Sequence, residues 1–441
     1  MNYAILTVGN RDIKLSENIN REFDGCREMG DFLLTNFSKL KDKIELPIIQ
    51  PFLDDIKKRK IKIDKFYLIA TDQEYGDYKK SDTINFARVI KLHLERKNYK
   101  VKIILLSKNV NNFMSNYSFF ENRFSDFESD KVNKYYILPV GGMPNINTPL
   151  LLTSIFIFRE KVVQYNVDKI QRNAYQVPFN QKLLKAIENE KIKILLENFY
   201  FASISNISSD DFIKRISKYT YNRLSQNFDK SKIIIDNMMI EYLDNNLMRF
   251  SESIANIRNN SEKKLEEMYF SARIKIEQSQ FVDALLRLYN FTDNLLLEEV
   301  CKLYRLDEKT NSFRKWWEKS YKKISKENPN ITDDLDEING SKAQLSQAGI
   351  PLYEKLIKFK DEENPIFEII KPLISITELR NKSIGAHGFD SVSINKINDK
   401  LSYFNINLRV LLQKIEKYIN ISFEKSDYSE IVRLIENRLE K

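Results

Sequence analysis

Arg380 and His387 are side chains whose types and spacing could carry out acid–base chemistry on a phosphodiester. Arginine presents a planar fork of donors that fits a phosphate, and histidine transfers protons near neutral pH. Such a pair can cleave RNA through attack by the RNA's own 2′-hydroxyl, without a metal ion, and would leave DNA intact. One pair is a small catalytic set, so two copies that meet across a homodimer would suit the reaction better. A solvated helix face with an incidental histidine is the alternative that residue types leave open.

The local pattern predicts that both side chains lie on one face of a helix. Pro372 suits the first turn of this helix, and apolar residues continue the periodicity to His387. The two residues are seven positions apart, which is nearly two turns or about 10 Å. Asn381 adds polarity beside Arg380. Glycines on both sides of the histidine would let a substrate backbone approach the imidazole.

The composition argues against several other kinds of site. With only 2 histidines and 2 distant cysteines, the chain lacks the ligands for a His- or Cys-based metal centre and the pairs for a disulfide scaffold. We therefore expect no metal cofactor. His93, the other histidine, falls at the edge of a predicted apolar helix face and is expected to be structural. The net charge of +9 permits a polyanionic partner without identifying one.

The start of the sequence does not resemble a signal peptide, since no long apolar segment follows a basic one. The longest apolar run, residues 149–158, is too short to span a bilayer. We therefore expect a cytoplasmic protein without a membrane partner.

Residues 1 to about 178 alternate strand-like and helix-like segments, which is typical of a doubly wound parallel sheet. Asp82 is expected to cap the helix that follows it. After Pro178 the strand signals stop and amphipathic helices continue. The length of 441 residues suggests two or three domains. We predict an α/β domain at 1–178, a helical connector at 179–275 and a helical bundle at 276–441. Strands are expected at 3–8, 65–70, 101–106, 135–140 and 162–167, and helices at 48–58, 82–96 and 149–158.

Glycine is scarce, with 10 in the chain, and it recurs in loops that follow predicted strands. Ligands of open parallel sheets bind beyond the carboxyl ends of the strands. The candidate loops are 9–12, 71–73 and 141–148, and the last of them runs into a helix start, where backbone N–H groups favour a phosphate. Neither a Walker A sequence nor a GxGxxG turn is present, which disfavours an ordinary ATPase or NAD enzyme. The loops predict a site for an anionic ligand, with simple βα turns as the alternative.

Segments at both ends of the chain resemble a known family. Residues 379–389, LRNKSIGAHGF, resemble the R-x(4–6)-H motif of HEPN ribonucleases, in the form found in ancillary ribonucleases of type III CRISPR systems (the Csm/Csx group). Residues 281–294, FVDALLRLYNFTDN, are similar to the first helix of that HEPN domain. The segments ILTVGNRDI and ILPVGGMPNINTPLL resemble the two ligand-binding loops of CARF domains, which have a Rossmann-like fold.

This resemblance implies an α/β N-terminal Rossmann-like (CARF) domain followed by an all-α HEPN domain. It also implies a homodimer that binds a cyclic oligoadenylate made by a type III CRISPR interference complex, without stable association with that complex. The ligand would be an allosteric activator of metal-independent cleavage of single-stranded RNA, and no cofactor would be required.

The same resemblance implies roles for particular residues. Arg380 and His387 match the catalytic pair, and Asn381 matches the polar residue that commonly follows the arginine. Arg287, on the first HEPN helix, is expected to hold the RNA backbone. Met143 stands where related loops often carry a hydroxyl residue, so whether this domain degrades its activator stays open. The residues on the presumed ligand loops are Gly9, Asn10, Arg11, Thr71, Gln73, Gly141, Gly142, Asn145 and Thr148.

Two other functions stay open. The chain could be a CARF-type sensor whose helical half only binds nucleic acid or protein. A binding module, however, has no need for Arg380 and His387 on the same face of a helix. It could also be a HEPN toxin unrelated to cyclic nucleotides, which the N-terminal α/β pattern disfavours.

Overall fold

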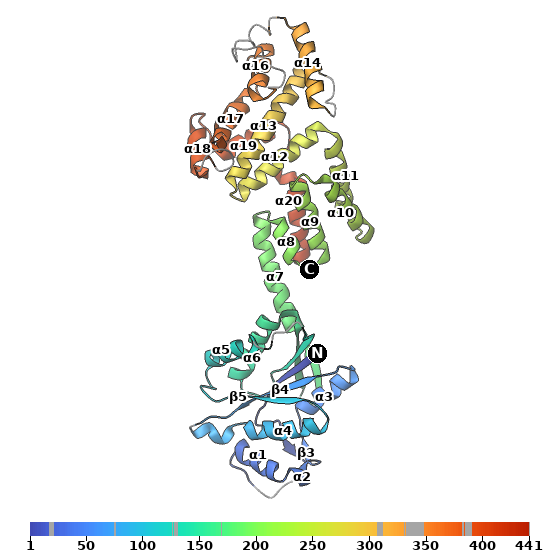
Figure 1. The fold of residues 1–441 in the computed structure, drawn as a ribbon, viewed down its shortest axis with the longest axis vertical. Coiled ribbons are helices and arrows are strands. Elements are labelled where there is room, and N and C mark those ends of the chain that lie inside the picture. Colours follow the sequence, from blue (N-terminus) through green and yellow to red (C-terminus); the bar gives the residue numbers. More distant parts are fainter. Residues whose placement is uncertain are drawn as a thin grey trace. The chain divides into compact units, whose positions relative to one another are not determined.

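The computed structural model describes residues 1–16, 22–74, 76–125, 127, 131–168, 170–306, 312–329, 331, 348–381, 383 and 390–440. The chain forms two compact units, Met1–Ile187 and Glu188–Lys441 (Figure 1). The boundary between them falls within helix α7 (Phe179–Glu197).

The first unit is built on a six-stranded sheet with the order β5-β4-β1-β6-β7-β8. All neighbouring strands are parallel except β8, which is antiparallel to β7. The parallel strands lie within two residues of the predicted bounds, whereas β8 was not predicted, because its polar residues resemble a loop. The strands are β1 (Asn2–Thr7), β4 (Lys65–Thr71), β5 (Val101–Leu106), β6 (Lys134–Leu138), β7 (Val162–Asp168) and β8 (Asn173–Val177), and β2 (Lys14–Leu15) pairs with β3 (Ile44–Glu45).

Helices pack on both faces of this sheet, because successive strand residues point to opposite sides. Leu6 and Leu68 share one hydrophobic core with α1, α3 and α4, whereas Ile5 and Ile69 share another with α5 and α6. The ribbon shows the helices on the two sides of the sheet (Figure 1). The unit is therefore doubly wound, as predicted. Its helical segments are α1 (Cys26–Thr35), α2 (Phe37–Leu40), α3 (Ile49–Lys58), η1 (Asp77–Ser81), α4 (Ile84–Arg96), α5 (Phe113–Ser125), α6 (Pro144–Phe158) and η2 (Arg159–Lys161).

The helix predicted to begin at Pro149 begins five residues earlier, at Pro144. Pro144 suits the first turn, where its missing N–H needs no partner. Pro149 lies inside the helix and cannot donate to the carbonyl of Asn145. Asn116 donates to that carbonyl instead, through Nδ2 at 2.7 Å. A contact with α5 therefore allows the helix to continue through Pro149.

The described part of the second unit is helical. One hydrophobic core extends from Ile192 to Ile435, so helices of the predicted connector and of the predicted bundle pack together. The functional division into three domains stays a prediction. The helical segments are α8 (Phe201–Ile207), α9 (Asp211–Leu224), α10 (Phe228–Glu241), α11 (Asn245–Asn259), α12 (Ser261–Glu277), α13 (Phe281–Leu303), α14 (Phe313–Glu327), α16 (Ile350–Lys360), α17 (Phe367–Asn381), α18 (Ile394–Ser402), α19 (Leu408–Tyr418), η4 (Phe423–Lys425) and α20 (Asp427–Leu439).

Among the helices that the structure describes, none has both the length and the apolarity needed to cross a bilayer.

Candidate functional site

A pocket of about 280 Å³ lies at the carboxyl ends of β1, β4 and β6. The chain runs from β1 through β4 to β5 on one side of the sheet and then crosses to β6 on the other side of β1. The pocket is therefore at the topological switch point, where open α/β sheets bind their ligands. These predicted ligand residues line it: Gly9, Asn10, Thr71, Gln73, Gly141 and Gly142.

Glycines allow the loops after β1 and β6 to lie in contact. A Cβ added at Gly9 would lie 1.5 Å from the carbonyl oxygen of Gly141, and one added at Gly141 would lie 2.2 Å from Oδ2 of Asp12. Asp12 is fully buried, and its Oδ2 accepts a hydrogen bond from the backbone N of Gly9 at 3.0 Å. The backbone N of Gly142 donates to Oγ1 of Thr7 at 3.1 Å. This side of the pocket is therefore a tight backbone surface.

The opposite side is held by buried polar contacts between the end of β4 and the start of α4. Thr71 and Thr83 each donate a backbone N–H to the other's Oγ1 at 3.1 Å. The carboxylate of Asp82, which is 0% exposed, accepts hydrogen bonds from N and Nε2 of Gln73. The expectation that Asp82 caps α4 is wrong, because Thr83 is the N-cap residue and Asp82 binds Gln73 instead.

The N-terminus of α6 also contributes to the pocket. Its N-cap residue Met143 and its residue Ile146 line the pocket, and no side chain caps the helix. The positive end of the helix dipole is therefore available to an anionic ligand beside the glycine loops.

Arg11, Asn145 and Thr148 are not among the residues that line this pocket. The side chain of Asn145 donates to the carbonyl oxygen of Asn111 at 2.8 Å, so it holds the loop after β5. Arg11 and Thr148 are exposed. Sequence reasoning missed Tyr78 and Asn111, which also line the pocket but lie outside the glycine loops and do not directly follow a strand. The role of all these residues in ligand binding stays a prediction.

The second candidate site begins with Arg380, near the end of α17. Its guanidinium carbon lies 4.2 Å from the ring centroid of Tyr289, on α13. Its Nε and Nη2 donate to Oδ1 of Asn381 at 3.3 and 3.1 Å. The aromatic face and the neighbouring amide thus orient the arginine, which remains partly exposed.

The expectation of one helix from Pro372 to His387 is wrong. Pro372 lies inside α17, which begins at Phe367 and ends at Asn381. Ser383 lies in a bend, where its backbone N and its Oγ donate to the carbonyl oxygen of Arg380 at 3.0 and 2.8 Å. Both bonds join residues three positions apart, as in a turn that follows a helix. His387 lies outside the described residues.

Arg287 makes contacts within the second unit. Its Nη1 donates to the carbonyl oxygen of Leu224 at 3.1 Å, and its Nε donates to Asp283 at 3.2 Å. The guanidinium therefore links α13 to the end of α9. Its predicted contact with an RNA backbone is untested.

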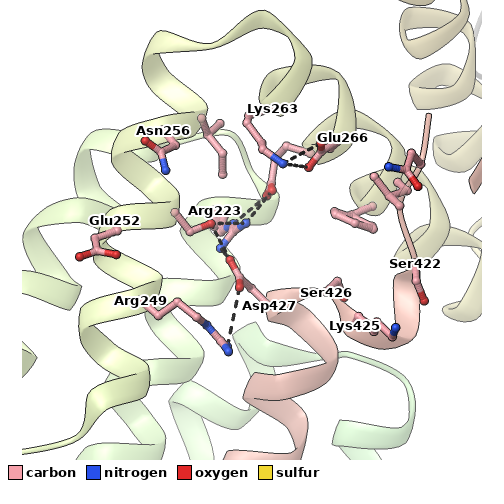
Figure 2. Close-up of a pocket in the computed structure, with 16 residues that line it drawn as sticks. Arg223, Arg249, Glu252, Asn256, Lys263, Glu266, Ser422, Lys425, Ser426 and Asp427 are labelled. Atoms are coloured by element: carbon pink, nitrogen blue, oxygen red, sulfur yellow. Dashed lines mark hydrogen bonds and ion pairs between the residues drawn. The ribbon is translucent and has the colours of Figure 1, made fainter.

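A larger cavity of about 650 Å³ in the second unit is lined by charged residues (Figure 2). Arg223, with 4% of its side chain exposed, contributes to this lining. All its guanidinium nitrogens donate, and the acceptors are Glu267, Asp427, Tyr219 and Ser253. Arginine has five N–H donors, so this network leaves none for a ligand. We interpret it as a structural ion network that joins α9, α11, α12 and α20.

Within the described residues, no group of three or more His, Cys, Asp or Glu side chains is placed to hold a metal ion. The absence of a metal requirement stays a prediction.

Comparisons with known proteins identify the fold. No protein-family model matches the sequence, and no curated protein matches it. Among solved structures, the chain is similar to Enterococcus italicus Csm6 bound to cyclic hexa-2′-fluoro-hexa-dAMP, with a TM-score of 0.60 and 14% identity. The match covers 98% of this chain and 100% of that chain. The predicted fold class, an α/β Rossmann-like domain followed by an all-α domain, is thereby confirmed, whereas the assignment of the two domains as CARF and HEPN stays a prediction: this chain has the fold of Csm6.

Proposed function

We propose that this chain is an endoribonuclease of type III CRISPR defence, activated by a cyclic oligoadenylate, that cleaves single-stranded RNA without a metal ion. The observation that carries the proposal is the pocket at the switch point of the first unit, lined by residues of both glycine loops. Its counterpart in fold, Csm6, was solved with a cyclic hexanucleotide analogue.

The pocket suits part of a cyclic oligonucleotide. Its volume of about 280 Å³ is just below the range of roughly 300–1,000 Å³ found for small-molecule sites. The uncapped start of α6 presents the positive end of its dipole to a phosphate, the tight glycine backbone lets the ligand approach closely, and polar side chains of the opposite wall face a base. A ring of several nucleotides extends beyond one such pocket. Two copies of the chain in a homodimer therefore bind one ring.

Cleavage takes place at Arg380 and His387 in this proposal. Arg380 binds the scissile phosphate and stabilises the charge of the pentacoordinate state, and its contact with Tyr289 keeps the fork in place. His387 accepts the proton of the 2′-hydroxyl as the 2′-oxygen bonds to phosphorus. An imidazolium of the homodimer's pair of His387 residues gives a proton to the 5′-oxygen as the P–O5′ bond breaks. Asn381 orients the arginine through its Oδ1.

The proposal is tested by titrating cyclic oligoadenylates of each ring size against a fluorescent single-stranded RNA reporter. One ring size should accelerate cleavage, and the rate should persist in EDTA. Absence of stimulation by every ring would contradict the sensor role. Loss of the stimulated rate in EDTA would contradict the metal-independent mechanism. If a cyclic oligoadenylate increases binding of the RNA reporter but the RNA is not cleaved, the result would favour a sensor with a non-catalytic helical half.

A further inference from the structure

The side-chain amide of Gln73 has a defined orientation in the pocket of the first unit. The backbone N of Gln73 donates a hydrogen bond to Oδ2 of Asp82 at 2.7 Å, and the side-chain Nε2 of Gln73 donates to Oδ1 of Asp82 at 3.1 Å. A carboxylate accepts hydrogen bonds and does not donate them, so the NH₂ end of the amide must face Asp82. The carbonyl end, Oε1, is directed elsewhere. Among the described residues, no hydrogen bond to this oxygen is made.

The surroundings of Asp82 keep this orientation. Asp82 is 0% exposed, and Nη2 of Arg27 lies 4.0 Å from its Oδ2. Arg27 also pairs with Asp72, which precedes Gln73. Rotation of the Gln73 amide by half a turn would place two oxygens against each other in a buried site, and such a contact is costly. Gln73 therefore presents an acceptor to the pocket.

An exposed aromatic ring lies on the same pocket. Tyr78, on η1, lines the pocket although it is 67% exposed. Met143, which also lines it, is 42% exposed. Exposed aromatic side chains beside polar groups are typical of sites that stack a nucleobase. A base stacked on Tyr78 would have its polar edge within the same pocket as Gln73.

We propose that Gln73 selects the base of the bound nucleotide, with Oε1 accepting a hydrogen bond from the 6-amino group of adenine. The 6-oxo group of hypoxanthine or guanine would bring a second acceptor against Oε1 and would be rejected. Asp82 is the positioning residue that sets this preference, and Tyr78 supplies the stacking surface. This inference rests on the proposed function, because it concerns the base of the same cyclic ligand.

The test compares two rings of equal size with the full-length chain, a cyclic oligoadenylate and the corresponding cyclic oligoinosinate, by isothermal titration calorimetry. Wild type should bind the adenylate ring about tenfold more tightly or better, as expected when one buried hydrogen bond is replaced by an acceptor–acceptor contact. Asp82→Asn offers an amide that can donate to Oε1 of Gln73, so the Gln73 amide can turn. The preference should then shrink or reverse, with tighter inosinate binding than in wild type.

Gln73→Leu and Asn10→Ala complete the design. Gln73→Leu removes the acceptor, so the ratio of the two affinities should approach one even if Asp82→Asn unfolds. Asn10→Ala, on the other wall, should weaken both rings equally and leave the ratio at its wild-type value. Equal affinities of wild type for both rings would overturn the role of Gln73 while the proposed function stands. The same holds if Gln73→Leu keeps the wild-type ratio. If wild type binds neither ring, the proposed function fails and this inference with it.

Discussion

Arg380 owes its orientation to two near neighbours, the ring of Tyr289 and the amide of Asn381. Neither contact neutralises its charge, so the guanidinium can still bind a phosphate. Lysine at this position would keep the charge but lose the fork that fits two phosphate oxygens. We therefore expect catalysis to require two hydrogen bonds from the guanidinium to two phosphate oxygens, and not only a positive charge.

His387→Ala should lower activator-stimulated RNA cleavage by about 100- to 10,000-fold, the usual contribution of a general acid or base. Cyclic oligoadenylate affinity and the melting temperature should be unchanged. The measurement is single-turnover cleavage of an RNA reporter.

His93→Ala is the matched control for this variant, because the chain has only 2 histidines. Burial lowers the pKa of His93, and Lys97 and Arg96 lower it further, so this imidazole is neutral at pH 7. Its replacement should leave the cleavage rate unchanged. If both variants lose the same fraction of the cleavage rate, the loss in His387→Ala would not be evidence for a catalytic role of His387.

Gly9→Ala should destabilise the first unit by about 2 kcal/mol or more, because the new Cβ would overlap the carbonyl oxygen of Gly141 at 1.5 Å. Gly349→Ala is the control. The φ of Gly349 is 171°, which is extended backbone, and apart from its chain neighbours no atom of the described residues lies within 4 Å of the added methyl group. Urea denaturation monitored by circular dichroism measures both. A Gly9→Ala variant as stable as Gly349→Ala would contradict the close contact between the loops.

At the scale of elements, the ion network around Arg223 joins helices that are far apart in sequence (Figure 2). Arg223 on α9 pairs with Glu267 on α12 at 2.9 Å and with Asp427 on α20 at 2.7 Å. Tyr428 donates to Glu267, and burial raises the pKa of its hydroxyl, so this donor stays protonated. Removing one partner of a buried ion pair is costly because the other charge is left without compensation.

The stability of this helical unit should fall in acid through Asp427. Burial alone would raise the pKa of Asp427, but Arg223 and the hydroxyl of Ser253 outweigh it and lower the pKa below the ordinary value. A carboxylate with a lowered folded-state pKa stabilises the fold above its unfolded pKa of about 3.9, and this contribution is lost as the pH falls through the folded value. Thermal melting of wild type between pH 7 and pH 3 should show this loss.

Asp427→Asn isolates that contribution. The variant should be less stable than wild type at pH 7 by about 1–3 kcal/mol, because Arg223 loses a charged acceptor. Its melting temperature should depend less on pH below about 4. Parallel melting curves for wild type and variant across this range would contradict the role assigned to Asp427.

At the scale of the whole molecule, the proposed function requires two copies of the chain around one ring. We expect light scattering coupled to gel filtration to give the mass of two chains, with and without a cyclic oligoadenylate. A monomer in the presence of a saturating ring would contradict the homodimer. Cyclic oligoadenylates of four and of six adenylates should be compared, since the size of one pocket does not select between these two ligands.

Much of the architecture could be predicted from local patterns, and the failures have a common cause. The parallel strands are short apolar runs bounded by polar turns, and such runs are visible without neighbours. The start of α6 was missed because it depends on Asn116, which satisfies the carbonyl that Pro149 leaves free. The end of α17 was missed because Ser383 bonds back to Arg380. Hydrogen bonds of this kind are not encoded in periodicity.

The order of an α/β half and a helical half, the glycine loops and the candidate Arg380–His387 pair could all be predicted from the linear sequence. These depend on composition and near-neighbour spacing, which a linear pattern contains. The folded chain was needed to show that the two glycine loops meet beside Gln73, that Asp82 orients the amide of Gln73, and that Arg223 is fully paired. Each of these is a contact between distant segments. Its geometry is set by how strands and helices pack, and not by the residues adjacent in the chain.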